Sequence, residues 1–543
     1  MTRFSSVLIR SIPRRCVVES NRKQIPWLIS QYHSAEKSYL IMNQHQWNRS
    51  AFGNTFSSYN KQQYANFSSL SNADGDKTDH KNINQSIKVE IISKEYIKPA
   101  SPTPDHMRMY EVSALDQLYP HFYMPFVYFY QNNHEDDGSE LINHCDLILK
   151  RRQLLKHSLA ETLSRFYPLA GVVKGSRLID CNDEGVYYVE AKVSGPLAEF
   201  LNQPDNKSIH RFLPIDPNSM ELLFSKTYVA MIQVTVFGCG GIAIGLCTSH
   251  KIIDGFSHTT FLKAWAATAA HECSSEKMIC PSFISPSIFP PNPTLPENAS
   301  MMSSSVLKLK KCATRRFLFG SSSIIALKKK AAVSTRVMAI IGLIWKCAVA
   351  ASKDQAKASN SIQRSSVMII PVNLREKSTP PMPPYAIGNI FWTTDPIQYG
   401  SDEDDLELDS IVGRLKNAIN KIDSDFIEKL KGEEWSLKVG ERLNEMHKQY
   451  SNENANLFMA SSMCNSGIYE TTFGWGKLLW ASVGNADADI PIVCNLITLI
   501  DTKSGNGVEA WVTLSEQDMA FLEKDPELLA FASVDPCPLQ IVD

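Results

Sequence analysis

The sequence has no excess of charge of one sign. Its 55 Lys and Arg residues nearly balance its 57 Asp and Glu residues, which leaves a formal net charge of -2. Nucleic-acid binding relies on a basic face that neutralises phosphates, and the composition as a whole provides none. The balance favours a small molecule or another protein as partner, and we expect no nucleic acid.

Long apolar runs are also missing. A membrane-spanning helix needs about 18 or more predominantly apolar residues. The nearest approach, Val337 to Trp345, is enclosed by Arg336 and Lys346. This segment is typical of a buried core element, and we expect no membrane association.

The 12 cysteines show neither C-x-x-C pairs nor regular spacing. In so long a chain without an apolar signal core, this pattern predicts reduced, mostly buried thiols. The same lack of ligand spacing argues against structural zinc, and no metal site is predicted.

What the chain does have is length and an ordinary globular composition. With 543 residues and 43% hydrophobic residues, it can form about two to four domains of roughly 100–200 residues each. The first 86 residues differ from the rest, because only Glu19 and Glu36 offset nine basic residues between Met1 and Ala73. An Arg-rich, Ser-rich and acid-poor start is typical of an organelle transit peptide or of a disordered leader, and we expect it to lie outside the fold.

Hydrophobic periodicity predicts a mixed α/β chain from about residue 87 onward. Strands are expected at 87–97, 229–237, 242–248, 316–319 and 366–372, and helices at 151–165, 261–270, 335–351 and 406–422. The turn 238–241 makes the second and third strands a hairpin. Six prolines between Pro281 and Pro296 predict an extended crossover between two domains.

The sharpest motif is the segment Ser249-His250-Lys251-Ile252-Ile253-Asp254-Gly255. It follows an apolar strand and precedes a helix, so His250 can face a cavity. A histidine has a pKa near neutrality and can take a proton from an alcohol and return it. The spacing alone favours a His–Asp pair with a purely structural role at a helix start.

Two further patterns were weighed against simpler interpretations. The glycines of 238–243 fit a dinucleotide-binding fingerprint, but that fingerprint needs a helix directly after it, and a strand is expected here. The segment Thr472-Phe473-Gly474-Trp475-Gly476 predicts a backbone bend. Trp475 would either pack into a core or donate its indole N–H to a developing oxyanion.

These motifs together resemble those of the plant BAHD acyltransferases, which carry H-x-x-x-D-G and D-F-G-W-G. The resemblance covers residues 87 to 543 and is closest to the branch of vinorine synthase, alkaloid and terpenoid acetyltransferases and alcohol acyltransferases. Further matching segments occur in the family's order: Leu115-Asp116-Gln117, Phe166-Tyr167-Pro168-Leu169-Ala170-Gly171, Val372-Asn373-Leu374-Arg375, Gly388-Asn389 and Gly507-Val508-Glu509-Ala510-Trp511-Val512.

The resemblance implies an α/β fold of two chloramphenicol-acetyltransferase-like domains with a channel between them. The expected boundaries are 1–86 for the extension, 87–275 and 315–543 for the domains, and 276–314 for the linker. His250 would be the general base, and Asp254 would support the motif by pairing with Arg375. Phe473, Gly474, Gly476 and Asn389 would be structural.

The resemblance also implies an acyl-CoA-dependent O-acyltransferase without a bound cofactor or metal. The co-substrate would be acetyl-CoA and the acceptor a hydroxyl of an alkaloid or a terpenoid such as a limonoid. An aliphatic alcohol or an amine as acceptor, and a ligand-binding protein without turnover, are the alternatives. A monomer in the cytoplasm is expected, with the mitochondrion or plastid as the alternative if the extension targets the chain.

One position departs from the family's pattern. Thr472 stands where the family has an aspartate that is thought to form an ion pair. A threonine keeps a hydroxyl but not the charge. We expect Arg336 to be the residue that would pair with the missing carboxylate.

Overall fold

The fold is described by a computed structural model in which the chain divides into two units, Met1–Ile83 and Asn84–Asp543. All described residues lie in the second unit. They are 87–132, 144–214, 227–271, 278–293, 295, 307–308, 312–333, 335–361, 364–399, 407–432, 434–450, 455–484, 492–493 and 495–540. The predicted N-terminal extension lies outside these residues, so both of its interpretations stay predictions.

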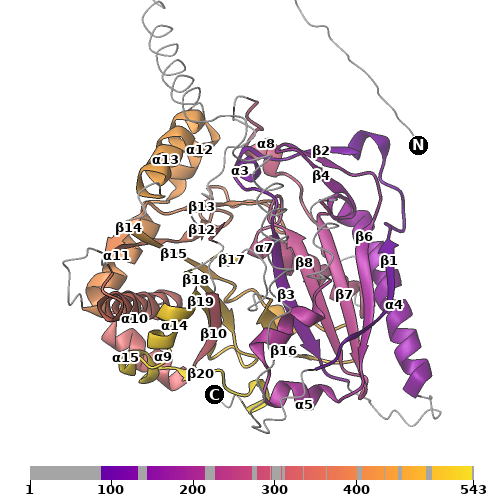
Figure 1. Ribbon diagram of the computed structural model, residues 1–543. Coiled ribbons are helices and arrows are strands. Elements are labelled where there is room, and N and C mark those ends of the chain that lie inside the picture. Colours follow the sequence, from indigo (N-terminus) through magenta and orange to yellow (C-terminus); the bar gives the residue numbers. More distant parts are fainter. Residues whose placement is uncertain are drawn as a thin grey trace, which may run out of the picture. The chain divides into compact units, whose positions relative to one another are not determined.

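The first large sheet has six strands in the order β1-β6-β7-β8-β3-β16 (Figure 1). Its strands are β1 Glu90–Ile97, β3 Tyr123–Tyr130, β6 Val186–Val193, β7 Ala230–Phe237, β8 Ile242–Ser249 and β16 Leu478–Val483. Strands β7 and β8 pair antiparallel across the turn at 238–241, which confirms the predicted hairpin. Every residue of these two strands is buried, so the residue that follows β8, His250, starts from the interior of the protein.

Strand β16 joins this sheet from far along the chain. It pairs antiparallel with β3, for example Val483 with Phe126, and the Gly484 N–H donates to the Pro125 carbonyl at 2.8 Å. The first sheet therefore needs a strand from beyond residue 315. The predicted domain boundaries stay a prediction.

The second large sheet has seven strands in the order β14-β11-β15-β18-β19-β10-β20. They are β10 Cys312–Phe319, β11 Ser365–Ile369, β14 Ile397–Tyr399, β15 Ala455–Ser462, β18 Leu496–Asp501, β19 Val508–Ser515 and β20 Ser533–Val534. The run β11-β15-β18 is parallel, whereas β18, β19 and β10 pair antiparallel. Parallel neighbours need a long crossover connection. The connection from β11 to β15 contains helices between residues 408 and 450, whereas the one from β15 to β18 passes through β16 of the first sheet.

Helices cover both large sheets (Figure 1). Helices α4 His144–Arg165 and α7 Gly255–Ala269 pack together on the first sheet and share its core through residues such as Leu159 and Trp265. Helix α10 Arg336–Ala358 packs on the second sheet beside α11 Leu408–Asn420 and α14 Glu516–Leu522.

The remaining elements are short or lie at the rims. The strands are β2 Met109–Glu111, β4 Val172–Lys174, β5 Leu178–Asp180, β9 Leu307–Lys308, β12 Pro371–Asn373, β13 Phe391–Thr393 and β17 Ile492–Val493. The α-helices are α3 Ala114–Gln117, α5 Leu197–Asn202, α8 Ser285–Ile288, α9 Ser321–Lys330, α12 Ser424–Lys431, α13 Trp435–Tyr450 and α15 Pro526–Leu529. The 3-10 turns are η1 Asp105–Met107, η2 Tyr167–Ala170, η3 Asn206–Phe212, η5 Ile468–Glu470 and η6 Pro538–Gln540. In the predicted linker, the described residues include α8 and the buried ring of Phe289.

The predicted elements are present, but several bounds were wrong. Helix α4 starts seven residues before the predicted 151–165, and α7 starts at Gly255 rather than at residue 261. The predicted strand 366–372 is interrupted at Ile370, so β11 and β12 belong to different sheets. The apolar run Val337–Trp345 lies inside α10, where Leu343 and Trp345 are fully buried, as expected of a core element.

The cysteines differ in part from the prediction. Among the described residues, eight are free thiols, but only Cys181, Cys247 and Cys347 of these are buried. Cys312 is disulfide-bonded, which the prediction of reduced thiols did not foresee. Sequence spacing could not reveal this bond, because a disulfide depends on Cα atoms that the fold brings within about 7 Å.

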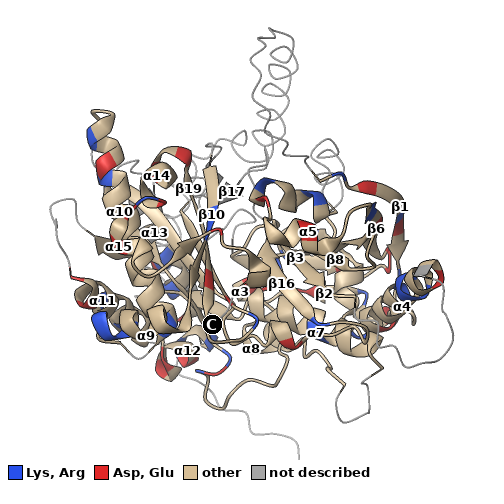
Figure 2. Ribbon diagram, turned by 90° about the horizontal axis from the view of Figure 1, so that it is seen from below, with Lys and Arg blue, Asp and Glu red and all other residues tan. Residues whose placement is uncertain are grey.

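Charge is distributed as the composition predicts. Figure 2 shows basic and acidic residues interspersed along the outer helices, while most of the strands carry neither. In the part of the chain that the structure describes, no helix is both long and apolar enough to cross a membrane.

Candidate active site

His250 lies at the point where the buried strand β8 ends and the chain turns into α7. Its backbone N–H donates to the Phe122 carbonyl at 2.8 Å, which continues the pairing of β8 with β3 by one residue. The side chain is half-buried. The strand thus fixes the backbone of His250 and leaves its imidazole partly open.

Asn389 fixes the orientation of that imidazole. The Asn389 side-chain amide donates to the carbonyls of His250 at 2.7 Å and Lys251 at 3.1 Å. Its Oδ1 therefore faces the His250 Nδ1, at 2.9 Å. Because an amide oxygen only accepts, Nδ1 must carry the proton, and Nε2 keeps the lone pair that a base needs.

Burial lowers the pKa of His250 below its ordinary value of 6.5, against smaller upward effects of the backbone, Asp254 and Asn389. The imidazole is therefore neutral at neutral pH. A neutral imidazole with a free Nε2 can accept a proton from a hydroxyl group within about 3 Å.

Asp254 is the N-cap of α7, and its Oδ1 accepts from the Ser257 N–H at 2.8 Å. Its two oxygens also accept hydrogen bonds from the Arg375 guanidinium: Nη1 donates to Oδ2 at 2.7 Å, and Nη2 donates to Oδ1 at 3.1 Å. The Ile390 N–H reaches Oδ2 at 3.3 Å. The carboxylate makes this contact with Arg375 as the resemblance implies, and no hydrogen bond joins it to the His250 ring.

Arg375 is itself held in place on the far side of this pair. Its Nε donates to the Ala386 carbonyl at 2.9 Å, and Nη2 donates to the Gly388 carbonyl at 3.0 Å. The ion pair is 6–7% exposed at its side chains. It joins the start of α7 to the segment that carries Asn389, and so it supports His250 indirectly.

Asp116 and Lys251, which were not predicted as site residues, complete this arrangement. The Asn389 N–H donates to the buried Asp116 carboxylate at 2.7 Å, which also caps α3 through Ser113. Lys251 Nζ donates to the carbonyls of Asp116 at 3.1 Å and Tyr119 at 2.9 Å. The capping box Ser113-x-x-Asp116 was readable from the sequence, but its contact with Asn389 was not.

The second motif lies at the other end of α7. The Thr472 hydroxyl donates to the Gly476 carbonyl at 3.1 Å and accepts from the Gly474 N–H at 3.2 Å. Gly474 has φ +90°, and an added Cβ would stand 3.3 Å from the Cα of Ala270, the C-cap of α7. The motif is therefore a tight turn that packs against the end of this helix.

The position of Trp475 favours the first of our two interpretations, a residue of the core. Helix α7 has 15 residues and so separates the two motifs by about 22 Å, at 1.5 Å per residue. Trp475 instead stacks on the fully buried Phe473 ring at 5.5 Å, with the Arg151 guanidinium 5.6 Å from its centroid. The interpretation as a core residue fits the structure.

Arg336 is also not the partner that we expected for position 472. Its Nη2 pairs with Asp501 at 2.7 Å and contacts Asn465 at 2.9 Å, while Nη1 donates to the Gly505 carbonyl at 2.6 Å. The guanidinium is thus committed to the hairpin between β18 and β19.

The sequence profile of a protein family described as the transferase family matches residues 87–529. This is most of the chain. The chain belongs to this family, the BAHD acyltransferases.

Individual relatives agree with this assignment. A limonoid 7-O-acetyltransferase of Citrus sinensis is 40% identical over 464 residues, covering 83% of this chain and 99% of the relative. The crystal structure of vinorine synthase is 32% identical and matches with a TM-score of 0.67, covering 82% of this chain and 99% of that one. This BAHD chain is therefore an acyltransferase.

A more distant structure shares only the fold. F. graminearum TRI101, solved with coenzyme A and T-2 mycotoxin, is 15% identical with a TM-score of 0.58, covering 79% of this chain and 99% of that one. Together with vinorine synthase it confirms the predicted fold class, two chloramphenicol-acetyltransferase-like domains.

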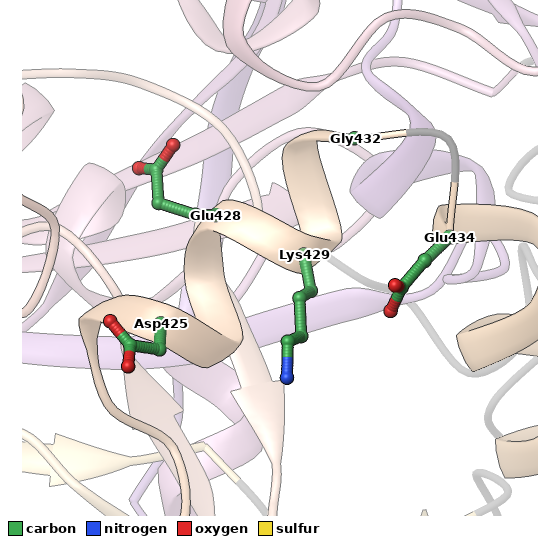
Figure 3. Close-up of a pocket in the computed structure, with 5 residues that line it drawn as sticks. All are labelled: Asp425, Glu428, Lys429, Gly432 and Glu434. Carbon is green, nitrogen blue, oxygen red and sulfur yellow. The ribbon is translucent and has the colours of Figure 1, made fainter.

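A separate hollow on the BAHD chain has no connection to His250. It measures about 640 Å³ and is lined by Asp425, Glu428, Lys429, Gly432 and Glu434. Figure 3 shows that these residues come from α12 and the segment that follows it, with Asp425 and Glu434 on either side of Lys429. No catalytic motif of the sequence lies there. Within the described residues, no cluster of three or more His, Cys, Asp or Glu side chains could hold a metal ion.

Proposed function

We propose that the chain transfers the acetyl group of acetyl-CoA to a hydroxyl group of a limonoid or a related plant specialised metabolite. The observation that carries the chemistry is the hydrogen bond of His250 Nδ1 to Asn389 Oδ1, which leaves Nε2 as a base. The choice of a limonoid rests on the 40% identity to the Citrus sinensis 7-O-acetyltransferase. Coenzyme A is present in the TRI101 structure of the same fold, which is consistent with acetyl-CoA as co-substrate.

In the proposed reaction, His250 Nε2 removes the proton of the acceptor hydroxyl as its oxygen attacks the thioester carbonyl. A tetrahedral intermediate forms with a C–O bond in place of the carbonyl π bond. The C–S bond then breaks, and the coenzyme A thiolate takes the proton from the imidazolium of His250. The acyl group passes directly to the acceptor, so neither an acyl-enzyme nor a metal is required.

The surrounding residues have positioning roles in this proposal. Asn389 selects the tautomer of His250, and the ion pair of Asp254 with Arg375 holds the segment on which Asn389 lies. Thr472, Phe473, Gly474 and Gly476 form a structural turn. Action as a monomer and in the cytoplasm stays a prediction, as does the alternative of targeting to the mitochondrion or plastid.

The test is an assay of the full chain with acetyl-CoA and a limonoid that has a free 7-hydroxyl group. We expect release of free coenzyme A and a product heavier by one acetyl group, measured by mass spectrometry. The His250→Ala variant should lose about 10²- to 10⁴-fold in kcat, the usual contribution of a general base. The control His157→Ala, at a histidine with a 73% exposed side chain, should keep the wild-type rate.

Other results would reject parts of the proposal. Acetylation of an alkaloid alcohol but not of the limonoid would change the acceptor class and leave the mechanism intact. Wild-type turnover by a folded His250→Ala variant would remove the general-base role. Absence of coenzyme A release with every alcohol and amine tested would favour a ligand-binding protein without turnover.

A further inference from the structure

Three aromatic rings surround the imidazole of His250. The Tyr119 ring stacks on it, with 5.5 Å between centroids and 22° between planes. The Phe122 ring lies 4.9 Å away at 32°. Phe391 meets the imidazole at 65° and 5.9 Å, and it contacts Tyr119 at 4.9 Å. The Tyr119 ring thus stacks on His250, the Phe122 ring is tilted against it, and the Phe391 ring meets it edge to face.

The backbone holds the rings of Tyr119 and Phe122 against His250. Lys251 Nζ donates to the Tyr119 carbonyl at 2.9 Å, and the His250 N–H donates to the Phe122 carbonyl at 2.8 Å. Residues 119 and 122 are therefore bound to residues 251 and 250 by hydrogen bonds that do not involve the rings. The stack exists in the structure before any substrate binds.

Within the described part of the chain, no hydrogen bond joins the imidazole to a carboxylate. Its Nδ1 partner is the neutral amide of Asn389. The elements packed around it carry these titratable or charged groups: Lys251 and Asp254 in its own turn, Asp116, Tyr119 and His121 in the segment before β3, Arg375 in the segment after β12, and Arg442 of α13, which lies near Tyr119. Asp254 is paired with Arg375, so the net charge of that pair is zero.

Proton transfer from the acceptor makes His250 a cation. Cations within about 6 Å of an aromatic centroid are attracted to the negative face of the ring, and the attraction is larger where water is excluded. We propose that the ring faces of Tyr119 and Phe122 stabilise the imidazolium of His250 and so set its proton affinity during acyl transfer. Tyr119 is then a positioning residue, which acts through His250 and needs no contact with substrate. The inference rests on the proposed role of His250 as the base.

The experiment measures the proton affinity of His250 without relying on turnover. Diethyl pyrocarbonate carbethoxylates only the neutral imidazole. The rate of modification of the peptide containing His250, followed by mass spectrometry across a pH series on the full chain, therefore gives its pKa. In a second experiment, kcat/KM for acetyl-CoA and the limonoid alcohol is measured over the same pH range. Its decrease at low pH, the acidic limb, reports the protonation of the base.

Replacing the ring by a smaller aliphatic side chain removes the π face and keeps an apolar neighbour beside His250. In Tyr119→Leu we expect the pKa from modification to fall by about half to one unit, with the acidic limb of kcat/KM moving down equally. Tyr119→Phe keeps the face and should behave as wild type. The control Tyr399→Leu removes a buried tyrosine of β14 whose ring meets that of Trp345 edge to face, and it should leave both curves unmoved.

An unchanged or raised pKa in folded Tyr119→Leu would overturn the inference. A shift in Tyr119→Phe as large as that in Tyr119→Leu would overturn it as well, because it would assign the effect to the hydroxyl. If Tyr119→Leu does not fold, Phe122→Leu removes the other face and must lower the pKa of His250 in the same direction. Failure of the proposed function would look different, because the wild type would then show no turnover. The pKa of His250 measured by modification would still test the inference in that case.

Discussion

The two ends of helix α7 are built differently, although a family motif lies at each. At its start, the Asp254 carboxylate accepts four hydrogen bonds, two of them from Arg375. At its end, the turn at 472–477 is closed by the hydroxyl of Thr472 and by ring packing, without an acidic side chain at position 472. The charged Asp254 lies at the end of α7 where it helps to position His250. The neutral Thr472 is sufficient at the other end, where the turn only supports the core.

The packing at the far end explains how a threonine can serve there. The Phe473 ring is fully buried and meets Tyr130 at 5.1 Å and Trp265 at 5.0 Å, both edge to face. Thr472 itself satisfies two backbone groups of the turn. The arginine that we expected to need a carboxylate here is paired with Asp501 instead.

Asp254→Ala should produce the largest change in stability. It leaves Arg375 buried without its partner and also removes the N-cap of α7. Loss of one member of a buried pair costs about 3–5 kcal/mol, so we expect a clearly lower free energy of unfolding, measured by urea denaturation, together with lost activity. Unchanged stability with lost activity would instead give Asp254 a direct catalytic role.

Thr472→Asp should have a smaller effect. A carboxylate can still accept from the Gly474 N–H, but it cannot donate to the Gly476 carbonyl, which it would face. We expect a loss of about 1 kcal/mol, measured in the same urea series beside Thr472→Ala. A gain in stability would mean that a cation stands within reach of position 472 and that the two ends of α7 are more alike than the contacts indicate.

Trp475→Phe should have the smallest effect on catalysis. It keeps an aromatic ring on Phe473 and removes the indole N–H, which is about a helix length from His250. We expect the kcat of the wild type, with some loss of thermal stability. A large fall in kcat at unchanged stability would indicate a direct role of Trp475 in acyl transfer. It would contradict the conclusion that the two ends of α7 have separate roles.

The local parts of the site could be predicted from the sequence. A strand, a turn and a helix start around His250 and Asp254 follow from patterns within a few residues, and the resemblance supplied Arg375. The hydrogen bond from Asn389 to His250 spans 139 residues, and the stack of Tyr119 on His250 spans a similar distance, so only the folded chain shows them. The separation of Trp475 from His250 follows from the length of α7, whose first turns lie outside the helix predicted from residue 261.

Strand β16 has a consequence for synthesis on the ribosome. Strand β3 is made early, but its outer edge stays open until residues 478–483 have been translated and have paired with it. A first sheet that needs a strand from near the end of the chain has a high contact order, which slows folding and leaves an unpaired edge exposed to other chains. The first half of this enzyme therefore completes its fold only after almost the whole polypeptide has emerged.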